Sequence, residues 1–233
     1  MKAVILAAGM GTRFGTLIPK PLTSLKNEMT ILDAQISKLS KIDGLDNIFI
    51  VVGYKKEIIM EAHPEGIFVY NDAYAHTNTA KSLLIALEKM NDDVIWLNGD
   101  VYFDSAVLDL LKVSQDSACL VDTKKCADEE IKYTLSDIGF IRELSKEVKN
   151  GEGEAVGINM VKQKDLKLFM EELRKVGQKD YFEKALENLT LSDKLKLKAI
   201  NIENNYCKEI DFEEDLLDVQ KHINESEINN GKI

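Results

Sequence analysis

Residues 1–22, MKAVILAAGMGTRFGTLIPKPL, decide the fold of this chain and the place of its site. The continuous apolar run from Ala3 to Leu6 is typical of a strand that is buried on both faces of a sheet. Small residues and two glycines follow at once, and glycine reaches backbone angles that are closed to other residues. A strand that runs into such a loop can point free backbone N–H groups at anionic oxygens. The stretch therefore predicts a phosphate-binding loop.

Two cations belong to the same loop. Arg13 follows Gly11 closely, and Lys20 stands in a P-K-P-L frame whose prolines restrict the backbone. The dinucleotide fingerprint would need a third glycine where this chain has Phe14, and a Walker A loop would need Gly-Lys-Ser/Thr, which is absent. A glycine pair after a strand is also compatible with an ordinary tight turn. The pattern that remains is L-A-A-G-x-G-x-R-(x)6-K.

Composition excludes several classes of function. The chain has 233 residues, of which 45% are hydrophobic, and this suits one large α/β domain. A net charge of −10 argues against a nucleic-acid or anionic membrane surface as the partner. The odd number of cysteines, with no C-x-x-C pair, fits a reducing cytosol. Because no long apolar run marks export or anchoring, we expect a cytoplasmic protein. The sequence is compatible with a homo-oligomer.

Hydrophobic periodicity predicts alternating helices and strands in the first half of the chain. Buried strands are expected at residues 47–52, 67–70, 94–97 and 118–121, and helices at residues 30–41, 55–62, 80–87 and 105–113. This alternation implies a parallel sheet with right-handed crossovers, which places ligands at the carboxyl ends of the strands.

The second half of the chain has a different pattern of predicted elements. Residues 131–135 and 140–144 flank a turn and predict an antiparallel excursion, and further strands are expected at residues 155–161 and 197–202. Apolar positions predict helices around residues 166–173 and 182–189 and a last one through residue 223. The fold class is thus α/β, a mostly parallel doubly wound sheet with a short antiparallel excursion. We expect one domain over residues 1–223 and a frayed polar tail over 224–233.

Two aspartates stand where ligands are expected. Asp100 directly follows a buried strand, and Gly99 before it permits close approach. An aspartate at that point often caps the next helix, but Asp104 already holds the capping position. Asp211 precedes the acidic first turn of the last helix, where negative charge also suits the helix dipole. Position alone therefore does not single out Asp211.

The motif L-A-A-G-x-G-x-R-(x)6-K, with N-G-D at Asp100 and E-I-D-x-x-E-D-L at Asp211, resembles the nucleotidyltransferases that join a nucleoside triphosphate to a phosphorylated sugar, alcohol or related acceptor. The resemblance spans Met1 to about Ile223. It implies that Asp100 and Asp211 hold Mg²⁺ against the triphosphate, and Mg²⁺ commonly binds one or two carboxylates together with substrate phosphates.

The resemblance also implies the remaining roles. Arg13 would hold the β/γ-phosphates, Lys20 would bridge the α-phosphate and the acceptor, and Lys146 would meet the acceptor phosphate, with Lys149 as an alternative. Glu154 would contact the acceptor or simply begin a strand. The nucleotide would be held by Leu6, Ala7, Ala8, Gly9, Gly11, Arg13, Lys20, Asn78, Thr79, Ser82, Gly99 and Asp100. Ordinary helix capping accounts equally well for Asn78, Thr79 and Ser82.

The expected acceptor is inferred from finer features of the resemblance to this family. Only six residues separate Arg13 and Lys20, whereas many hexose-1-phosphate members have a longer loop, and the short form is more similar to phosphocholine-type cytidylyltransferases. We therefore expect CMP transfer from CTP to a phospho-alcohol or phosphonate, for cell-surface polysaccharide or lipid precursors. The alternatives are a sugar-1-phosphate uridylyl- or thymidylyltransferase and a non-catalytic nucleotide-binding regulatory module. The second alternative would tolerate loss of the cations and aspartates, which are all present.

Overall fold

Strand β1 (Lys2–Ala7) lies inside the central sheet and sends side chains to both of its faces. The computed structural model describes residues 1–11, 18–124 and 130–229. Ala3 and Ile5 pack into the hydrophobic cluster on one side, and Val4 and Leu6 pack into the cluster on the other. The apolar run therefore forms the doubly buried strand that the sequence predicts.

The described residues form one large sheet with the strand order β10-β9-β11-β6-β1-β4-β5, and β8 joins β11 to β12. Strands β4, β1 and β6 are parallel to one another, whereas β11 runs antiparallel to β6, β8 and β9. This arrangement confirms the mostly parallel α/β fold with an antiparallel second half. The further strands are β4 (Asn47–Val52), β5 (Ile67–Tyr70), β6 (Val94–Asn98), β8 (Ala118–Asp122), β9 (Lys132–Leu135), β10 (Ile141–Ser145), β11 (Gly153–Val161) and β12 (Lys198–Asn201).

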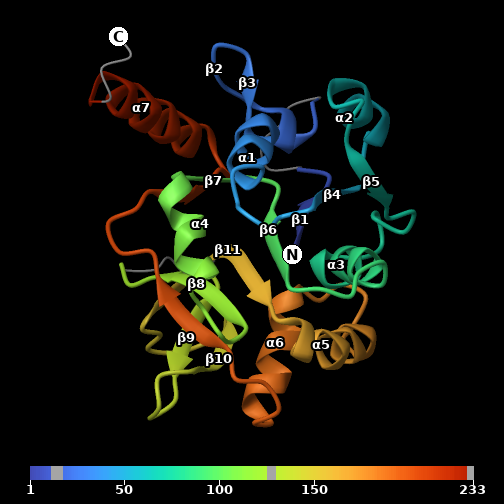
Figure 1. Cartoon of the computed structure of the whole chain (residues 1–233), viewed down its shortest axis with the longest axis vertical. Coiled ribbons are helices and arrows are strands. Elements are labelled where there is room, and N and C mark those ends of the chain that lie inside the picture. The colour runs from blue at the N-terminus through green and yellow to red at the C-terminus, as the bar shows by residue number, and fades with distance from the viewer. Residues whose placement is uncertain (12–17, 125–129, 230–233) are drawn as a thin grey trace.

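Helices cover both faces of the sheet (Figure 1). One cluster takes apolar side chains from α1 (Ile31–Leu39), α2 (Lys56–Ala62) and α4 (Ser105–Lys112), and the other takes them from α3 (Thr79–Leu87), α5 (Gln163–Lys175) and α6 (Phe182–Leu191). In the second cluster the ring of Trp96 stacks on Phe169 and meets Phe182 edge-on, with ring centroids 5.3 Å and 5.5 Å apart. This aromatic group fixes α5 and α6 against β6.

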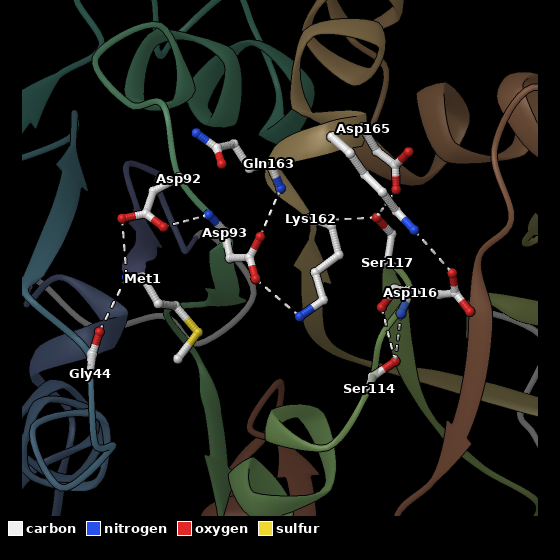
Figure 2. A network of polar contacts seen from close by, with 11 residues as sticks. Met1, Gly44, Asp92, Asp93, Ser114, Asp116, Ser117, Lys162, Gln163 and Asp165 are labelled. Carbon is white, nitrogen blue, oxygen red and sulfur yellow. Dashed lines mark hydrogen bonds and ion pairs between the residues drawn. The ribbon is translucent and has the colours of Figure 1, made fainter.

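A network of polar side chains lies at the amino ends of β1 and β6 (Figure 2). Asp93 accepts hydrogen bonds from Lys162 Nζ at 3.0 Å and from the backbone N–H of Gln163 at 2.8 Å. The Ser117 hydroxyl donates to Asp165 at 2.7 Å and accepts from the Lys162 backbone N–H at 3.0 Å. These bonds tie the end of β11 and the start of α5 to the strands beside them.

A smaller two-stranded sheet joins the middle of the chain to its last helix. β7 (Val101–Phe103) pairs antiparallel with β13 (Cys207–Glu209), and α7 (Glu213–Asn229) follows β13. The short elements η2 (Lys20–Leu22), β2 (Ser24–Lys26) and β3 (Met29–Thr30) lie between β1 and α1. No helix in the described ranges is both long enough and apolar enough to cross a membrane.

The expected fraying after residue 223 is wrong for residues 224–229, which continue α7. Ile223 is buried in a small cluster with Leu25 and Ile31, so the helix has a packed face there. Lys26 forms an ion pair with Glu227, one turn further on. Tertiary contacts thus keep helical a segment whose composition predicted a loose end.

Candidate active site

A cavity of about 460 Å³ opens at the carboxyl ends of β1 and β6, beside the start of β11. Parallel strands place ligands at this end of a sheet. Most of the residues predicted from the sequence line it: Leu6, Ala7, Gly9, Gly11, Lys20, Asn78, Gly99, Asp100, Lys146 and Asp211. Arg13 lies outside the described residues, and its predicted role stays a prediction.

Two glycines give the cavity its shape. At Gly99 a Cβ atom would lie 2.7 Å from the backbone oxygen of Leu6, so only glycine lets the end of β6 pass this close to β1 and present Asp100. Gly11 has a φ of +56°, in the left-handed region that favours glycine, and a Cβ there would lie 3.2 Å from the Cβ of Lys20. The loop after β1 is therefore folded directly against Lys20.

Lys20 joins the two predicted aspartates. Its Nζ lies 2.8 Å from Asp100 Oδ2 and 2.5 Å from Asp211 Oδ1. Burial of the ammonium lowers the pKa of Lys20, but the two carboxylates outweigh that effect and raise it above its ordinary value. The fold thus brings together three charged residues that lie up to 191 positions apart in the chain.

A third carboxylate, Glu209, joins Asp100 and Asp211, and one oxygen from each of the three lies within 4.8 Å of the others. Asp100 Oδ1 is buried without a hydrogen-bond partner in the described structure. Glu209 is an exposed residue, yet desolvation of its carboxyl by the surrounding protein and the negative charge of both aspartates raise the pKa of that carboxyl. Three convergent carboxylates with an unsatisfied oxygen suit a hard divalent cation such as Mg²⁺.

Glu209 was not predicted from the sequence as a metal ligand. The sequence feature that could have indicated it is the E-x-D spacing of Glu209 and Asp211, because residues two apart in an extended segment project to the same side. The backbone N–H of Ile210 donates to the Asp100 carbonyl at 3.0 Å, and this bond holds the segment beside the end of β6.

Lys146, Tyr181 and Glu183 line the same cavity. Lys146 Nζ lies 5.6 Å from the centroid of the Tyr181 ring. The alternative residue Lys149 is exposed and does not line the cavity, so of these two lysines Lys146 is the one in the cavity wall. Glu183 was not singled out in the sequence, because an acidic residue in the first turn of a helix is commonplace there.

Four of the predicted contact residues do not line the cavity: Ala8, Thr79, Ser82 and Glu154. The Ser82 hydroxyl accepts a hydrogen bond from Asn71 Nδ2 at 2.9 Å, and the Thr79 hydroxyl accepts one from the backbone N–H of Phe182 at 3.2 Å. These hydroxyl groups therefore hold α3 against the neighbouring segments. Asn78 caps that helix by accepting from the Thr79 N–H at 2.9 Å, and it also lines the cavity.

Glu154 and Asp104 have partners away from the cavity. Glu154 Oε1 lies 3.6 Å from Lys124 Nζ, and burial raises the pKa of its carboxyl. Asp104 stands at the N-cap position of α4, but its side chain makes no capping bond. It instead meets His222 Nε2 at 2.9 Å, so the expected capping role of this side chain is wrong. The bond to α7 replaces the cap.

A model of the MobA-like NTP transferase domain family matches residues 3–161. The CTP:phosphoglutamine cytidylyltransferase of Campylobacter jejuni is 29% identical over 254 residues, which cover 93% of this chain and 98% of that protein. The CMP-5'-(3-aminopropyl)phosphonate synthase of Streptomyces rubellomurinus is 32% identical over 133 residues, which cover 53% of this chain and 21% of that protein. Several curated relatives are longer, and the chain spans about half of their length or less.

A solved structure of the CTP:phosphocholine cytidylyltransferase of Streptococcus pneumoniae superposes on the chain with a TM-score of 0.76. The two are 21% identical, and the match covers 95% of this chain and 98% of that chain. This likeness shows a shared fold.

Proposed function

The chain belongs to the family of MobA-like NTP transferase domains, and from this premise we propose that it transfers CMP from CTP to a small acceptor that carries a phosphate or phosphonate group. The observation that carries the proposal is the contact of Lys20 with both Asp100 and Asp211 in the wall of the cavity. A cation and a cluster of carboxylates at a glycine-rich loop suit a triphosphate with its divalent metal.

In the proposed reaction an oxygen of the acceptor's phosphate attacks the α-phosphorus of CTP in line. A new O–P bond forms, the bond to the β-phosphate oxygen breaks, and pyrophosphate leaves with that electron pair. The acceptor oxygen is already anionic, so the protein need not supply a nucleophile or a general base. Its residues bring two polyanions together and neutralise their charge.

Lys20 and Lys146, which both line the cavity, would carry that neutralisation. Lys20 would meet the α-phosphate and the incoming acceptor, and Lys146 would meet the acceptor phosphate. Asp100 and Asp211, with Glu209, would hold Mg²⁺, which when bound supplies positive charge to the triphosphate and orients it. Mg²⁺ between these carboxylates would also leave the Lys20 ammonium available to phosphate oxygens.

The names of two relatives support the choice of substrates. One relative is a CTP:phosphoglutamine cytidylyltransferase, and the other is a CMP-5'-(3-aminopropyl)phosphonate synthase. Both names describe a cytidine nucleotide joined to a small phosphorylated or phosphonylated compound that contains nitrogen. We therefore favour CTP and a short amino-alcohol phosphate or aminophosphonate over UTP with a hexose 1-phosphate.

The test is a matrix of nucleotides and acceptors assayed for Mg²⁺-dependent release of pyrophosphate. CTP, UTP, dTTP and GTP are each combined with phosphocholine, 2-aminoethyl phosphate, 3-aminopropylphosphonate, inositol phosphate and glucose 1-phosphate. We expect the highest kcat/KM with CTP and a nitrogen-containing acceptor. A higher kcat/KM for glucose 1-phosphate with UTP or dTTP would favour the sugar alternative. Tight nucleotide binding without pyrophosphate from any pair would favour a non-catalytic module.

A further inference from the structure

Glu183 is a buried acid in the cavity wall that the mechanism above does not use. It stands in the first turn of α6, the residue is only 7% exposed, and it lines the same cavity as Lys20 and Lys146. Its Oε2 atom has no hydrogen-bond partner in the part of the chain that the structure describes. An unsatisfied buried carboxylate oxygen is costly, so a ligand that supplies a donor there would be bound favourably.

A second glutamate on the same helix shows what a purely structural acid looks like. Glu187 lies one turn after Glu183 and is also 7% exposed. One of its oxygens accepts from the Leu144 backbone N–H at 3.2 Å, and the other accepts from Lys184 Nζ at 3.0 Å. Both Glu187 oxygens are therefore satisfied by the protein, whereas Glu183, a residue of the cavity wall, keeps one buried oxygen without a partner in the described structure.

Resting on the function proposed above, we propose that Glu183 forms a subsite for a primary ammonium group at the end of the acceptor opposite its phosphate. Two features of the cavity lead to this chemistry. The ligand must satisfy an oxygen that lacks a donor, and it must balance a negative charge away from water. A primary ammonium does both, a hydroxyl supplies a donor without charge, and a trimethylammonium supplies charge without an N–H donor.

Lys146 would set the orientation of the acceptor in this subsite. It lines the same cavity, and its charge partly offsets the effect of burial, which raises the pKa of Glu183 to about 7. Lys146 and Glu183 thus place opposite charges in the wall of one cavity. An acceptor with phosphate at one end and ammonium at the other matches this pair of charges.

The experiment compares three acceptors that differ only in the terminal group. 2-Aminoethyl phosphate, 2-hydroxyethyl phosphate and phosphocholine are assayed with CTP, and the binding of each is measured by calorimetry. The proteins are the wild type, Glu183→Gln and Glu187→Gln, the last being the matched control from the same buried helix face. We expect the wild type to favour the aminoethyl compound over the hydroxyethyl compound by about 30- to 100-fold, the scale for a desolvated charge pair.

In Glu183→Gln we expect that preference to fall to within about threefold, with the KM for CTP unchanged, while Glu187→Gln keeps it. Equal preference in the wild type and Glu183→Gln, with normal turnover, would overturn the subsite and leave the proposed function standing. Selective binding of 2-aminoethyl phosphate that depends on Glu183, without turnover of any nucleotide, would support the subsite and overturn the proposed reaction. The absence of both selective binding and turnover would overturn both.

Discussion

The two ends of the central sheet use charged residues in opposite ways. At the amino end, Asp93, Lys162 and Ser117 all find partners within the protein (Figure 2). At the carboxyl end, Asp100 and Glu183 each leave a buried oxygen without a partner in the described structure. Both ends carry carboxylates and lysines, so composition does not separate them. The difference lies in hydrogen-bond satisfaction, which marks the first end as structural and the second as prepared for ligands.

The largest expected effect is at the carboxyl end, in Lys20→Ala. We expect the variant to fold and to lose about 10²- to 10³-fold in turnover, the usual scale for removing one preorganised charge-stabilising group. Steady-state release of pyrophosphate measures the change. Lys162→Ala, at the amino end, is the control and should leave turnover unaltered. Near-normal turnover in folded Lys20→Ala would remove Lys20 from the mechanism.

The second prediction concerns the stability of the unliganded protein. Burial raises the pKa of Glu183 to about 7 from 4.5, so the folded state holds a proton that the unfolded state has released. That contribution to stability is present at low pH and is lost as the pH rises through 7. The stability of Glu183→Gln does not depend on this proton. The free energy of unfolding of the variant, relative to that of the wild type, should therefore rise by about 2 kcal/mol from pH 5.5 to pH 8.

Urea denaturation at the two pH values measures this gain, and both values lie above the sequence pI of about 4.9. The same stability difference between Glu183→Gln and the wild type at both pH values would contradict this prediction.

Third, Asp211→Asn and Asp100→Asn should each raise the Mg²⁺ concentration for half-maximal activity by about 10-fold or more, the scale for perturbing a metal site. One negative ligand is lost from a group of three whose oxygens lie within 4.8 Å. Metal titration of activity and of heat release measures the shift. Asp116→Asn, whose carboxylate pairs with Lys164 at 3.2 Å, is the control at the amino end. An unchanged titration curve in both site variants would place the metal elsewhere.

The smallest effect is expected at the amino end, in Asp93→Ala. This variant loses the bonds from Lys162 and Gln163 and should be destabilised by about 1–2 kcal/mol. Its kcat and KM should match those of the wild type. Chemical denaturation and pyrophosphate release measure the two properties. A large loss of turnover in a folded Asp93→Ala would contradict the division of the sheet into a structural end and a ligand end.

Sequence alone determined the features that depend on local pattern. The apolar run at Ala3–Leu6 predicted a doubly buried strand, and the alternation after it predicted the parallel sheet, because side-chain periodicity reflects burial of each face. The glycine-rich motif and Asp100 could be predicted as parts of the site because ligands bind parallel sheets at the carboxyl ends of the strands. The family match confirms the resemblance drawn from that motif.

Tertiary structure alone decided which side chains reach the cavity. Ser82 and Thr79 looked like nucleotide contacts, but packing turned their hydroxyls toward Asn71 and Phe182. Glu183 and Glu187 are nearly alike in sequence context, and only distant residues determine that Glu187 meets Leu144 whereas Glu183 meets the cavity. Glu209 likewise joins Asp100 only when β13 pairs with β7. Such placements depend on long-range contacts, which no local periodicity encodes.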